Sequence, residues 1–396
     1  MKYHDLVSTR TVMIKFLRIN NIIKFRQMKK YISLMCIIFI LSCNKNVGLI
    51  ENVYNEEIDL TKEENSIKID SNISGIYTLL SASKGTIIGY NYFLHTLDVI
   101  DIVNNSAFQI TLNRDGENSI PSEPQGLFLS SMDSIWIYLH HVAYLIDGKG
   151  NIKQKHNIPF YEGEFVHIMT NYAISTTKFF FNENRKSIFY LLKFNDNFFV
   201  REYFPENGDV INYELEYSRA THKPLDAYGW KQLPNVCFTE NKIVYNYPFE
   251  SNVYQIDLLT KEKKAFGGKS RYTDNIATEM KKSFIYENAE RHKMENIHFC
   301  EILYNEKFNV YYRLHFDKIP FKTNDDPAVL YNQKKIYLTL FDNDFSIIKE
   351  IELESNVYNY YTGWVMTNNG LAIFHRELQN SDTDNELLKI DIIRPK

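Results

Sequence analysis

The sequence has few cysteines for its length, only four in 396 residues. Cys36 and Cys43 lie in an apolar N-terminal stretch, so Cys237 and Cys300 are the two that remain in the body of the protein. Two thiols cannot supply the framework of disulfides that holds many small secreted domains together. We expect two separately buried thiols, with a single disulfide between them as the alternative.

The motifs of common catalytic and cofactor sites are missing as well. The chain has no glycine-rich phosphate loop, no serine nucleophile elbow and no cluster of Cys and His spaced for zinc. His140 and His141 are adjacent at a predicted strand end and would point to opposite faces, while the acidic runs 342–344 and 382–386 do not match a calcium-binding loop. We therefore expect no cofactor and no metal, and we assign no catalytic residue.

Blocks of like charge are also absent. The 45 basic and 49 acidic residues nearly balance and give a net charge of −4. Proteins that bind nucleic acid usually carry a basic patch, so we expect no nucleic-acid partner. We expect a monomer with a surface of mixed charge.

The apolar run near the N-terminus is short. It extends from Tyr31 to Leu41, whereas a helix needs about 20 residues to cross a hydrocarbon core about 30 Å thick. Lys29 and Lys30 precede the run, and Ile40-Leu41-Ser42-Cys43 ends it with the lipobox order of an aliphatic residue, a small residue and a cysteine. This arrangement predicts a bacterial lipoprotein signal whose cysteine is acylated.

The signal divides the chain into three predicted parts. Residues 1–42 form the signal peptide, residues 43–52 a tether, and residues 53–396 the folded domain. Met28 is the predicted true start, because a signal normally begins close to its basic cluster; a long basic extension is the alternative. Either start gives the same mature protein, held to a membrane by lipid on Cys43.

Aromatic residues are abundant, with 28 Tyr and 27 Phe, and together with many β-branched residues they favour strands.

In one recurring pattern an apolar strand ends near an Asp, a short polar turn follows, and a second strand begins. Its copies are residues 97–112, 143–158, 190–204, 253–267 and 336–353, with a partial copy at 386–395. A further strand pair precedes each copy. The intervals of 46 and 49 residues between Asp101, Asp147 and Asp196 match a propeller blade of about 40–50 residues.

Six such repeats predict an all-β fold, a six-bladed β-propeller with four-stranded antiparallel blades. The last repeat lacks one strand, and we expect the N-terminal segment from Val53 to Leu60 to supply it and close the ring. Residues 206–232 break the pattern and predict a long loop or a short helix. Residues 274–295 predict one short helical insertion, because their apolar residues recur at helical spacing.

The lipobox, the repeat and the run Tyr311-Tyr312-Arg313 together resemble the uncharacterised lipoproteins of the Bacteroidetes that carry a domain of unknown function. The resemblance covers about residues 45–395, and its most specific element is the segment 301–316. It implies a six-bladed β-propeller in the cell envelope without an assigned activity. Asn44-Lys45-Asn46 lack the acidic cluster of surface-exported lipoproteins in this phylum, so the resemblance implies an outer-membrane anchor facing the periplasm.

Candidate ligand-binding residues are large side chains with polar tips that we expect near blade ends. Arg313 is the foremost, because a guanidinium beside the tyrosines Tyr311 and Tyr312 can hold a carboxylate or phosphate in bidentate fashion while a ring stacks on the ligand. A structural ion pair between blades is the alternative role for Arg313. The other candidates are Trp136, Trp230, Trp364, His375 and Arg376, and the tryptophans could equally be core residues.

We expect a binding or interaction module that takes a small molecule, a glycan or a protein on its propeller face. The alternative is a carbohydrate-active or other hydrolytic enzyme, which would need two carboxylates about 5–10 Å apart in the axial channel. A subunit of an envelope complex is a third hypothesis, and it would expose an apolar patch on one face. The fold serves all three and does not decide among them.

Overall fold

The computed structural model describes residues 48–396 apart from 56–57, 71, 78, 167–177, 221–224, 281–285, 323, 359–362, 377–378 and 381–385. The chain has two units, Met1–Gly48 and Leu49–Lys396, and the elements below all belong to the second. The predicted signal peptide and Cys43 lie outside the described residues. Among the described residues, no helix combines the length and the apolar character needed to cross a membrane.

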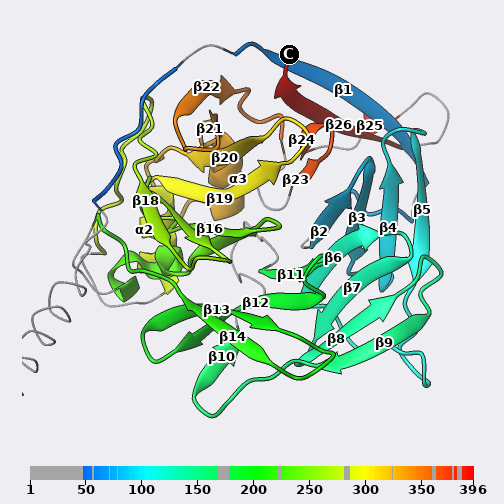
Figure 1. The fold of residues 1–396 in the computed structure, drawn as a ribbon. Coiled ribbons are helices and arrows are strands. Elements are labelled where there is room, and N and C mark those ends of the chain that lie inside the picture. Colours follow the sequence, from blue (N-terminus) through cyan, green and yellow to red (C-terminus); the bar gives the residue numbers. More distant parts are fainter. Residues whose placement is uncertain are drawn as a thin grey trace, which may run out of the picture. The chain divides into compact units, whose positions relative to one another are not determined.

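In the second unit, six antiparallel sheets are arranged as blades around a common axis (Figure 1). The first three blades are β2 (Leu80–Ser83), β3 (Thr86–Asn91), β4 (Thr96–Asp101) and β5 (Ser106–Thr111); β6 (Gly126–Ser131), β7 (Ser134–Leu139), β8 (Val142–Ile146) and β9 (Ile152–Asn157); and β11 (Phe179–Asn182), β12 (Ser187–Phe194), β13 (Asn197–Tyr203) and β14 (Val210–Glu214), with β10 (Glu164–Val166) also paired to β12.

The other three blades are β15 (Asn235–Phe238), β16 (Lys242–Asn246), β17 (Val253–Asp257) and β18 (Lys263–Phe266); β19 (His298–Asn305), β20 (Val310–Phe316), β21 (Ile336–Phe341) and β22 (Ile347–Leu353); and β23 (Trp364–Thr367), β24 (Gly370–Phe374), β26 (Glu386–Pro395) and β1 (Leu60–Ile69), with β25 (Gln379–Asn380) also paired to β26. The predicted fold, a six-bladed propeller of four-stranded antiparallel blades, is confirmed.

The core lies between the faces of neighbouring blades. For example, Leu97 and Val99 of blade 1 share an apolar cluster with Leu127 and Ile135 of blade 2. Because inner strands have a blade on each face, both sides of such a strand are buried, and all seven residues of β20 are buried. Polar side chains on an inner strand must therefore find partners inside the protein.

The recurring Asp of the repeat caps the turn between the third and fourth strands of a blade. In blade 2, Asp147 Oδ1 accepts hydrogen bonds from the backbone N–H groups of Lys149 and Asn151, both at 2.9 Å. Asp342 does the same in blade 5. The hydrogen bonds from Asn151 lower the pKa of Asp147 below its usual value. The pattern is therefore a turn signal, as Asp side chains that bond the backbone nearby commonly are.

Blade 3 departs from the predicted register. Asp196 lies in the turn between the second and third strands, because residues 190–204 contain most of β12 and all of β13. The fourth strand, β14, falls inside residues 206–232, which we predicted as a loop or a short helix. β14 is an outermost strand with one buried residue, Tyr213, so it lacks a clear apolar pattern. The predicted short helix is also present there, as the 3-10 helix η1 (Leu225–Gln232).

An N-terminal strand closes the ring, but it is β1 (Leu60–Ile69) and not the segment from Val53 to Leu60. β1 pairs with β26 along its whole length, from Leu60 opposite Pro395 to Ile69 opposite Glu386. Its sequence is largely polar because only one face is buried, and charged residues on an outer strand also discourage pairing with other chains. This composition hid the strand from the sequence-based prediction.

The segment before β1 instead runs along the outer edges of blades 4 and 5. Ile50 accepts a hydrogen bond from the N–H of Gly267 and donates one to Ala265 O, both at 2.9 Å, beside β18. Farther on, Ile347 at the start of β22 donates to Val53 O at 3.0 Å. The N-terminal segment therefore contacts blades 4 and 5 before it completes blade 6.

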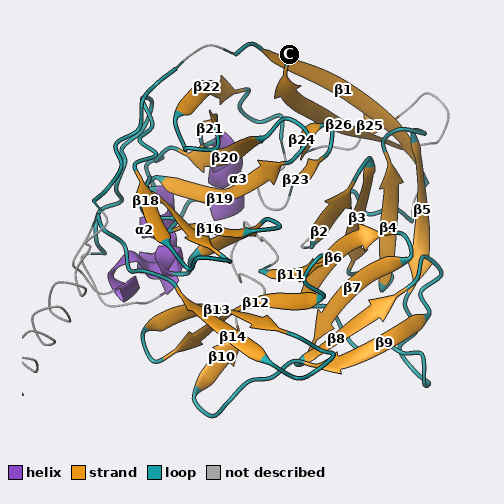
Figure 2. Cartoon of the chain, in the orientation of Figure 1, coloured by secondary structure: helices purple, strands orange, loops and turns teal. Residues whose placement is uncertain are grey.

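Helices lie together on the side of blades 4 and 5 (Figure 2). The predicted insertion helix is present as α2 (Tyr286–Met294), and it contacts η1 and α3 (Pro327–Gln333). α3 was not predicted; it begins at a proline, which suits the first position of a helix because its missing N–H would have no helical partner there. Lys334, just after α3, donates hydrogen bonds to the carbonyls of Lys293, Met294 and Asn296 and so fixes the end of α2.

Hydrogen bonds join the first hairpin of one blade to that of the next. Ser83 Oγ donates to Ser130 O at 2.8 Å, Asn182 Nδ2 to Glu240 O at 3.0 Å, Asn305 Nδ2 to Thr367 O at 2.7 Å, and Asn368 N to Lys84 O at 3.1 Å. These hairpins therefore meet at one end of the axis. The innermost strands consequently run in one direction, and their first residues gather at the opposite end.

We predict that Ile67→Ala lowers the free energy of unfolding by about 2–5 kcal/mol, because Ile67 is fully buried where β1 joins blade 6. The neighbouring Lys68 is exposed on the same strand, so Lys68→Ala is the matched control, with an expected change within about 0.5 kcal/mol. Denaturant unfolding measures both. Equal stability of the two variants would show that β1 does not hold the ring closed.

Candidate functional site

The innermost strands enclose a cavity of about 660 Å³ on the propeller axis. Residues of all six innermost strands line it. One wall is aromatic: Phe128, Phe180 and Phe238 come from β6, β11 and β15, three successive blades. The ring centroids of Phe128 and Phe180 lie 4.9 Å apart, and those of Phe180 and Phe238 lie 5.5 Å apart with nearly parallel planes. This wall offers an apolar surface on which a ligand could stack.

Glu301 on β19 is the buried carboxylate of this cavity. Its position results from a β-bulge: the register of β19 with β20 shifts between Phe299 and Ile302, which leaves Cys300 and Glu301 opposite a single residue, Leu314. A bulge breaks the regular alternation of side chains and often redirects one of them near a functional site.

Only one oxygen of Glu301 has a hydrogen-bond partner among the described residues. Oε1 accepts a hydrogen bond from the indole N–H of Trp364 at 2.7 Å, whereas Oε2 is buried and has no such partner in the described part of the chain. Burial raises the pKa of Glu301 to about 7, because the charged form loses its hydration. The carboxyl group therefore changes its charge near neutral pH.

Lys178 is the second buried charged group at this end of the axis. It directly precedes β11, is fully buried, and its Nζ has no hydrogen-bond partner among the described residues. Burial lowers the pKa of Lys178 to about 7, and the negative charge of Glu301 acts in the opposite direction. Blade 4 separates the blades of these two residues, so their interaction implies that both lie close to the axis.

Neither Lys178 nor Glu301 was among the sequence-based candidates. In both cases the only signal in the sequence is a single charged residue next to apolar residues. Lys178 precedes the three phenylalanines of β11, and Glu301 follows Cys300. Such a residue is rarely buried without a partner, and it therefore marks a position worth testing.

Cys237 on β15 also lines the cavity. Cys237 and Cys300 are both free, so the expected pair of separate thiols is confirmed; Cys300 is buried and Cys237 half-buried. Burial raises the pKa of Cys237 to about 12, which keeps it in the thiol form at neutral pH. A thiolate is the reactive species, so Cys237 is not an activated nucleophile.

The structure disperses the residues that the sequence suggested as one ligand site. Trp364 lines the cavity and donates a hydrogen bond to Glu301. Tyr311 also lines the cavity, and its side chain is almost fully buried. Tyr312 is fully buried between blades. His375 lies just after β24, at the seam of the ring, and Trp230 lies on η1, where its side chain falls outside the described residues. Of this set, Trp364 is best placed for a ligand in the cavity.

Trp136 and Arg376, the other two suggested residues, lie elsewhere. Trp136 is buried and stacks on Phe181, with 4.4 Å between ring centroids, as the alternative of a core residue anticipated. The backbone N–H of Arg376 donates to Val357 O at 2.8 Å.

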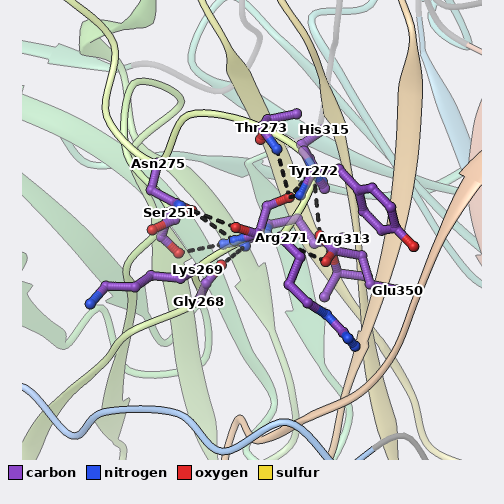
Figure 3. A network of polar contacts seen from close by, with 12 residues as sticks. Ser251, Gly268, Lys269, Arg271, Tyr272, Thr273, Asn275, Arg313, His315 and Glu350 are labelled. Atoms are coloured by element: carbon purple, nitrogen blue, oxygen red, sulfur yellow. Dashed lines mark hydrogen bonds and ion pairs between the residues drawn. The ribbon is translucent and has the colours of Figure 1, made fainter.

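Arg313 lies between blades 4 and 5 and is almost fully buried, with 1% of its surface exposed (Figure 3). Its Nη1 and Nη2 donate hydrogen bonds of 2.6 Å to the backbone carbonyls of Ser251 and Gly268. The guanidinium also lies between two rings, 4.5 Å from the centroid of Phe299 and 5.0 Å from that of Phe341. These contacts fit the alternative structural role between blades, with carbonyls in place of the expected carboxylate.

We predict that Arg313→Ala destabilises the protein by about 3–5 kcal/mol, because it leaves two buried carbonyls without donors and removes the guanidinium from between the rings. Arg394→Ala is the control: it removes a partly exposed ion pair with Glu63 and should cost less than about 1 kcal/mol. Thermal and denaturant unfolding distinguish the two. A stable Arg313→Ala variant would free Arg313 for a role in ligand binding.

A family model matches residues 53–352 of the chain, and its description is "Domain of unknown function (DUF4221)". The structure is similar to that of a DUF4221 member from Bacteroides vulgatus, with a TM-score of 0.71 and 19% sequence identity; the match covers 86% of this chain and 99% of the other. A protein from Bacteroides fragilis, named as a candidate exported protein, matches with a TM-score of 0.51 and 10% identity, covering 88% and 100% of the two chains.

At these identities the structural matches show the fold alone. No curated protein matches the chain. The family model nevertheless covers most of it, and the resemblance to a family with a domain of unknown function is confirmed. The chain belongs to the DUF4221 family.

Proposed function

We propose that this protein binds a small ligand in its axial cavity, at Glu301 and Lys178. The observation that carries the proposal is the pair of buried polar atoms, Glu301 Oε2 and Lys178 Nζ, which have no hydrogen-bond partner among the described residues. Burying such groups without partners destabilises the folded state, and buried polar groups in folded proteins normally have partners. A ligand that supplies the missing hydrogen bonds would recover part of this cost.

The lining of the cavity indicates the chemistry of the ligand. The wall of Phe128, Phe180 and Phe238 suits a flat apolar face, and Glu301 in the lining requires a hydrogen-bond donor. Lys178 is not itself part of the lining but directly precedes Phe179, which is, and its ammonium group requires an acceptor. A sugar ring combines an apolar face with hydroxyl groups that both donate and accept. The volume of about 660 Å³ lies within the range of roughly 300–1,000 Å³ typical of small-molecule sites.

At Glu301, binding is favoured over glycoside hydrolysis by the positions of the other carboxylates. Hydrolysis at Glu301 would need a second carboxylate about 5–10 Å away. Glu306 directly follows β19 and lies five residues after Glu301. At about 3.3 Å per residue of extended strand, the two are roughly 16 Å apart. Glu183 and Glu240 lie near Glu306, in the first hairpins of blades 3 and 4 at the other end of the cavity. Among the described residues, the charged partner of Glu301 is therefore Lys178.

A protein partner is the second candidate, and one turn favours it. Tyr92, Phe93 and Leu94, between β3 and β4, expose 56%, 84% and 48% of their surfaces. Three adjacent residues form a small patch compared with the roughly 800 Å² that each partner buries in a standard interface. The cavity therefore remains the better supported site.

We also propose that the protein is exported and held in the outer membrane by lipid on Cys43, facing the periplasm. The lipobox that ends at Cys43 supports the anchor, and the absence of acidic residues directly after it supports the periplasmic side. The candidate exported protein of the same fold is consistent with export.

The ligand proposal predicts which variants lose binding. A thermal-shift screen of mono- and oligosaccharides and small carboxylates should give compounds that raise the Tm of the wild type, and Lys178→Met and Glu301→Gln should each abolish that rise. Lys242→Ala is the control, because Lys242 lines the opposite end of the cavity and should leave binding unchanged. Compounds that stabilise Lys178→Met and Glu301→Gln as strongly as the wild type would refute the proposed site.

The anchor is tested separately in the bacterial cell. We expect a labelled fatty acid to be incorporated into the wild-type chain and not into Cys43→Ala, because this thiol is the predicted acyl acceptor. Cys237→Ala is the control and should be labelled like the wild type. Undiminished labelling of Cys43→Ala would contradict the lipoprotein assignment.

A further inference from the structure

A second cluster of chemically reactive side chains lies at the seam of the ring, outside the axial cavity. Glu64 and Asp391 are direct partners in the register of β1 with β26, and His375 follows the last residue of β24. One ligand atom from each of the three residues lies within 4.8 Å of the other two. The cluster therefore brings together an imidazole and two carboxylates from three neighbouring strands.

The spacing of two of these atoms suits a tetrahedral metal ion, and the third, from Glu64, lies within 4.8 Å of both. His375 Nε2 and Asp391 Oδ2 are 3.3 Å apart. Two ligands that bind zinc at about 2.0–2.1 Å in tetrahedral geometry are separated by about 3.3 Å. The two side chains could thus bind one ion with little movement.

Asp391 Oδ1 is buried and has no hydrogen-bond partner among the described residues. His375 Nε2 likewise makes no hydrogen bond there, although it lies within ion-pair distance of Asp391 Oδ2, at 3.3 Å. The side chain of Asp391 is fully buried, and that of His375 is 14% exposed. A buried carboxylate normally has both oxygens hydrogen-bonded or coordinated. The unpartnered Oδ1 of Asp391 is therefore an indication, separate from the spacing, that something else binds at this place.

A tyrosine and two lysines also contact the carboxylates of the cluster. Tyr358 donates its hydroxyl hydrogen to Asp391 Oδ2 at 2.7 Å, and Lys62 Nζ lies 3.3 Å from the same oxygen. Lys389 pairs with Glu64 at 3.0 Å. Lys62 is the main competitor of a cation, but its side chain is 52% exposed and can turn toward solvent.

We propose that Glu64, His375 and Asp391 bind a zinc ion at the seam of the propeller. An imidazole nitrogen with carboxylate oxygens is a common zinc ligand set, whereas calcium and magnesium prefer oxygen ligands alone. Glu64 is more than 300 residues from His375 and Asp391, and the spacing of His375 and Asp391 matches no metal-binding motif, so the sequence predicts no metal here. A zinc ion here would link β1 to β24 and β26 and so reinforce the closure of the ring.

The test uses the whole chain without a polyhistidine tag. Equilibrium dialysis against zinc chloride should give one zinc ion per chain, and zinc should raise the Tm. His375→Gln should weaken zinc binding by at least about 10-fold and abolish the rise in Tm. His140→Gln is the matched control, because His140 is an exposed histidine in a distant turn and should bind zinc like the wild type.

Lys62→Gln gives a second, independent readout. Removing the competing ammonium group should raise zinc affinity several-fold without adding a ligand. If the cluster is only an ion-pair network, Lys62→Gln will bind no zinc and zinc will not change its Tm. Absence of zinc binding in both the wild type and Lys62→Gln, or unchanged binding in His375→Gln, would overturn the proposal.

Discussion

The pairing of β1 with β26 is the constraint on which the rest of the structure depends. Without β1, blade 6 would end in a bare edge and the two ends of the ring would be free to separate. The ten residue pairs of these strands join the beginning of the folded domain to its end. Closure at the rim also brings β23 against β2 at the axis, so it completes the wall of the cavity.

The buried charged residues fall into two groups that differ in their partners. Lys334 directs its ammonium group to three carbonyls, and Arg313 donates to two while lying between aromatic rings. These residues hold neighbouring elements together. Lys178 Nζ and Glu301 Oε2, by contrast, have no hydrogen-bond partner among the described residues. The same degree of burial thus supports a structural role for Lys334 and Arg313 and the proposed binding role for Lys178 and Glu301.

The sequence predicted the repeating parts of the fold better than its exceptions. Turn residues such as Asp147 and Asp342 and the alternation of inner strands follow local rules, so the number of blades could be counted. β1 and β14 were missed as strands, because outer strands bury one face and have little apolar pattern. Their assignment depends on tertiary pairing and not on local preference.

The functional residues were harder to predict than the strands. Arg313 directly follows two tyrosines and so has the local sequence of a ligand site, and only the packing of blade 4 against it reveals its carbonyl partners. Glu301 faces the cavity because of a β-bulge, and no residue type in the sequence of β19 predicts that bulge. Trp364 was predicted as a ligand residue. Its hydrogen bond to Glu301 could not be predicted, because it joins blades 5 and 6, which are brought together only in the folded propeller.

The central claim is that Lys178 and Glu301 are retained for binding and not for stability. The free energy of unfolding of the double variant Lys178→Met/Glu301→Gln, compared with the wild type at pH 7, tests it most directly. The account predicts a change between zero and a gain of about 4 kcal/mol, because replacing a buried charged pair by uncharged residues of similar size is often neutral or stabilising. A loss of about 3 kcal/mol or more would show that the pair holds the propeller together and would contradict the account.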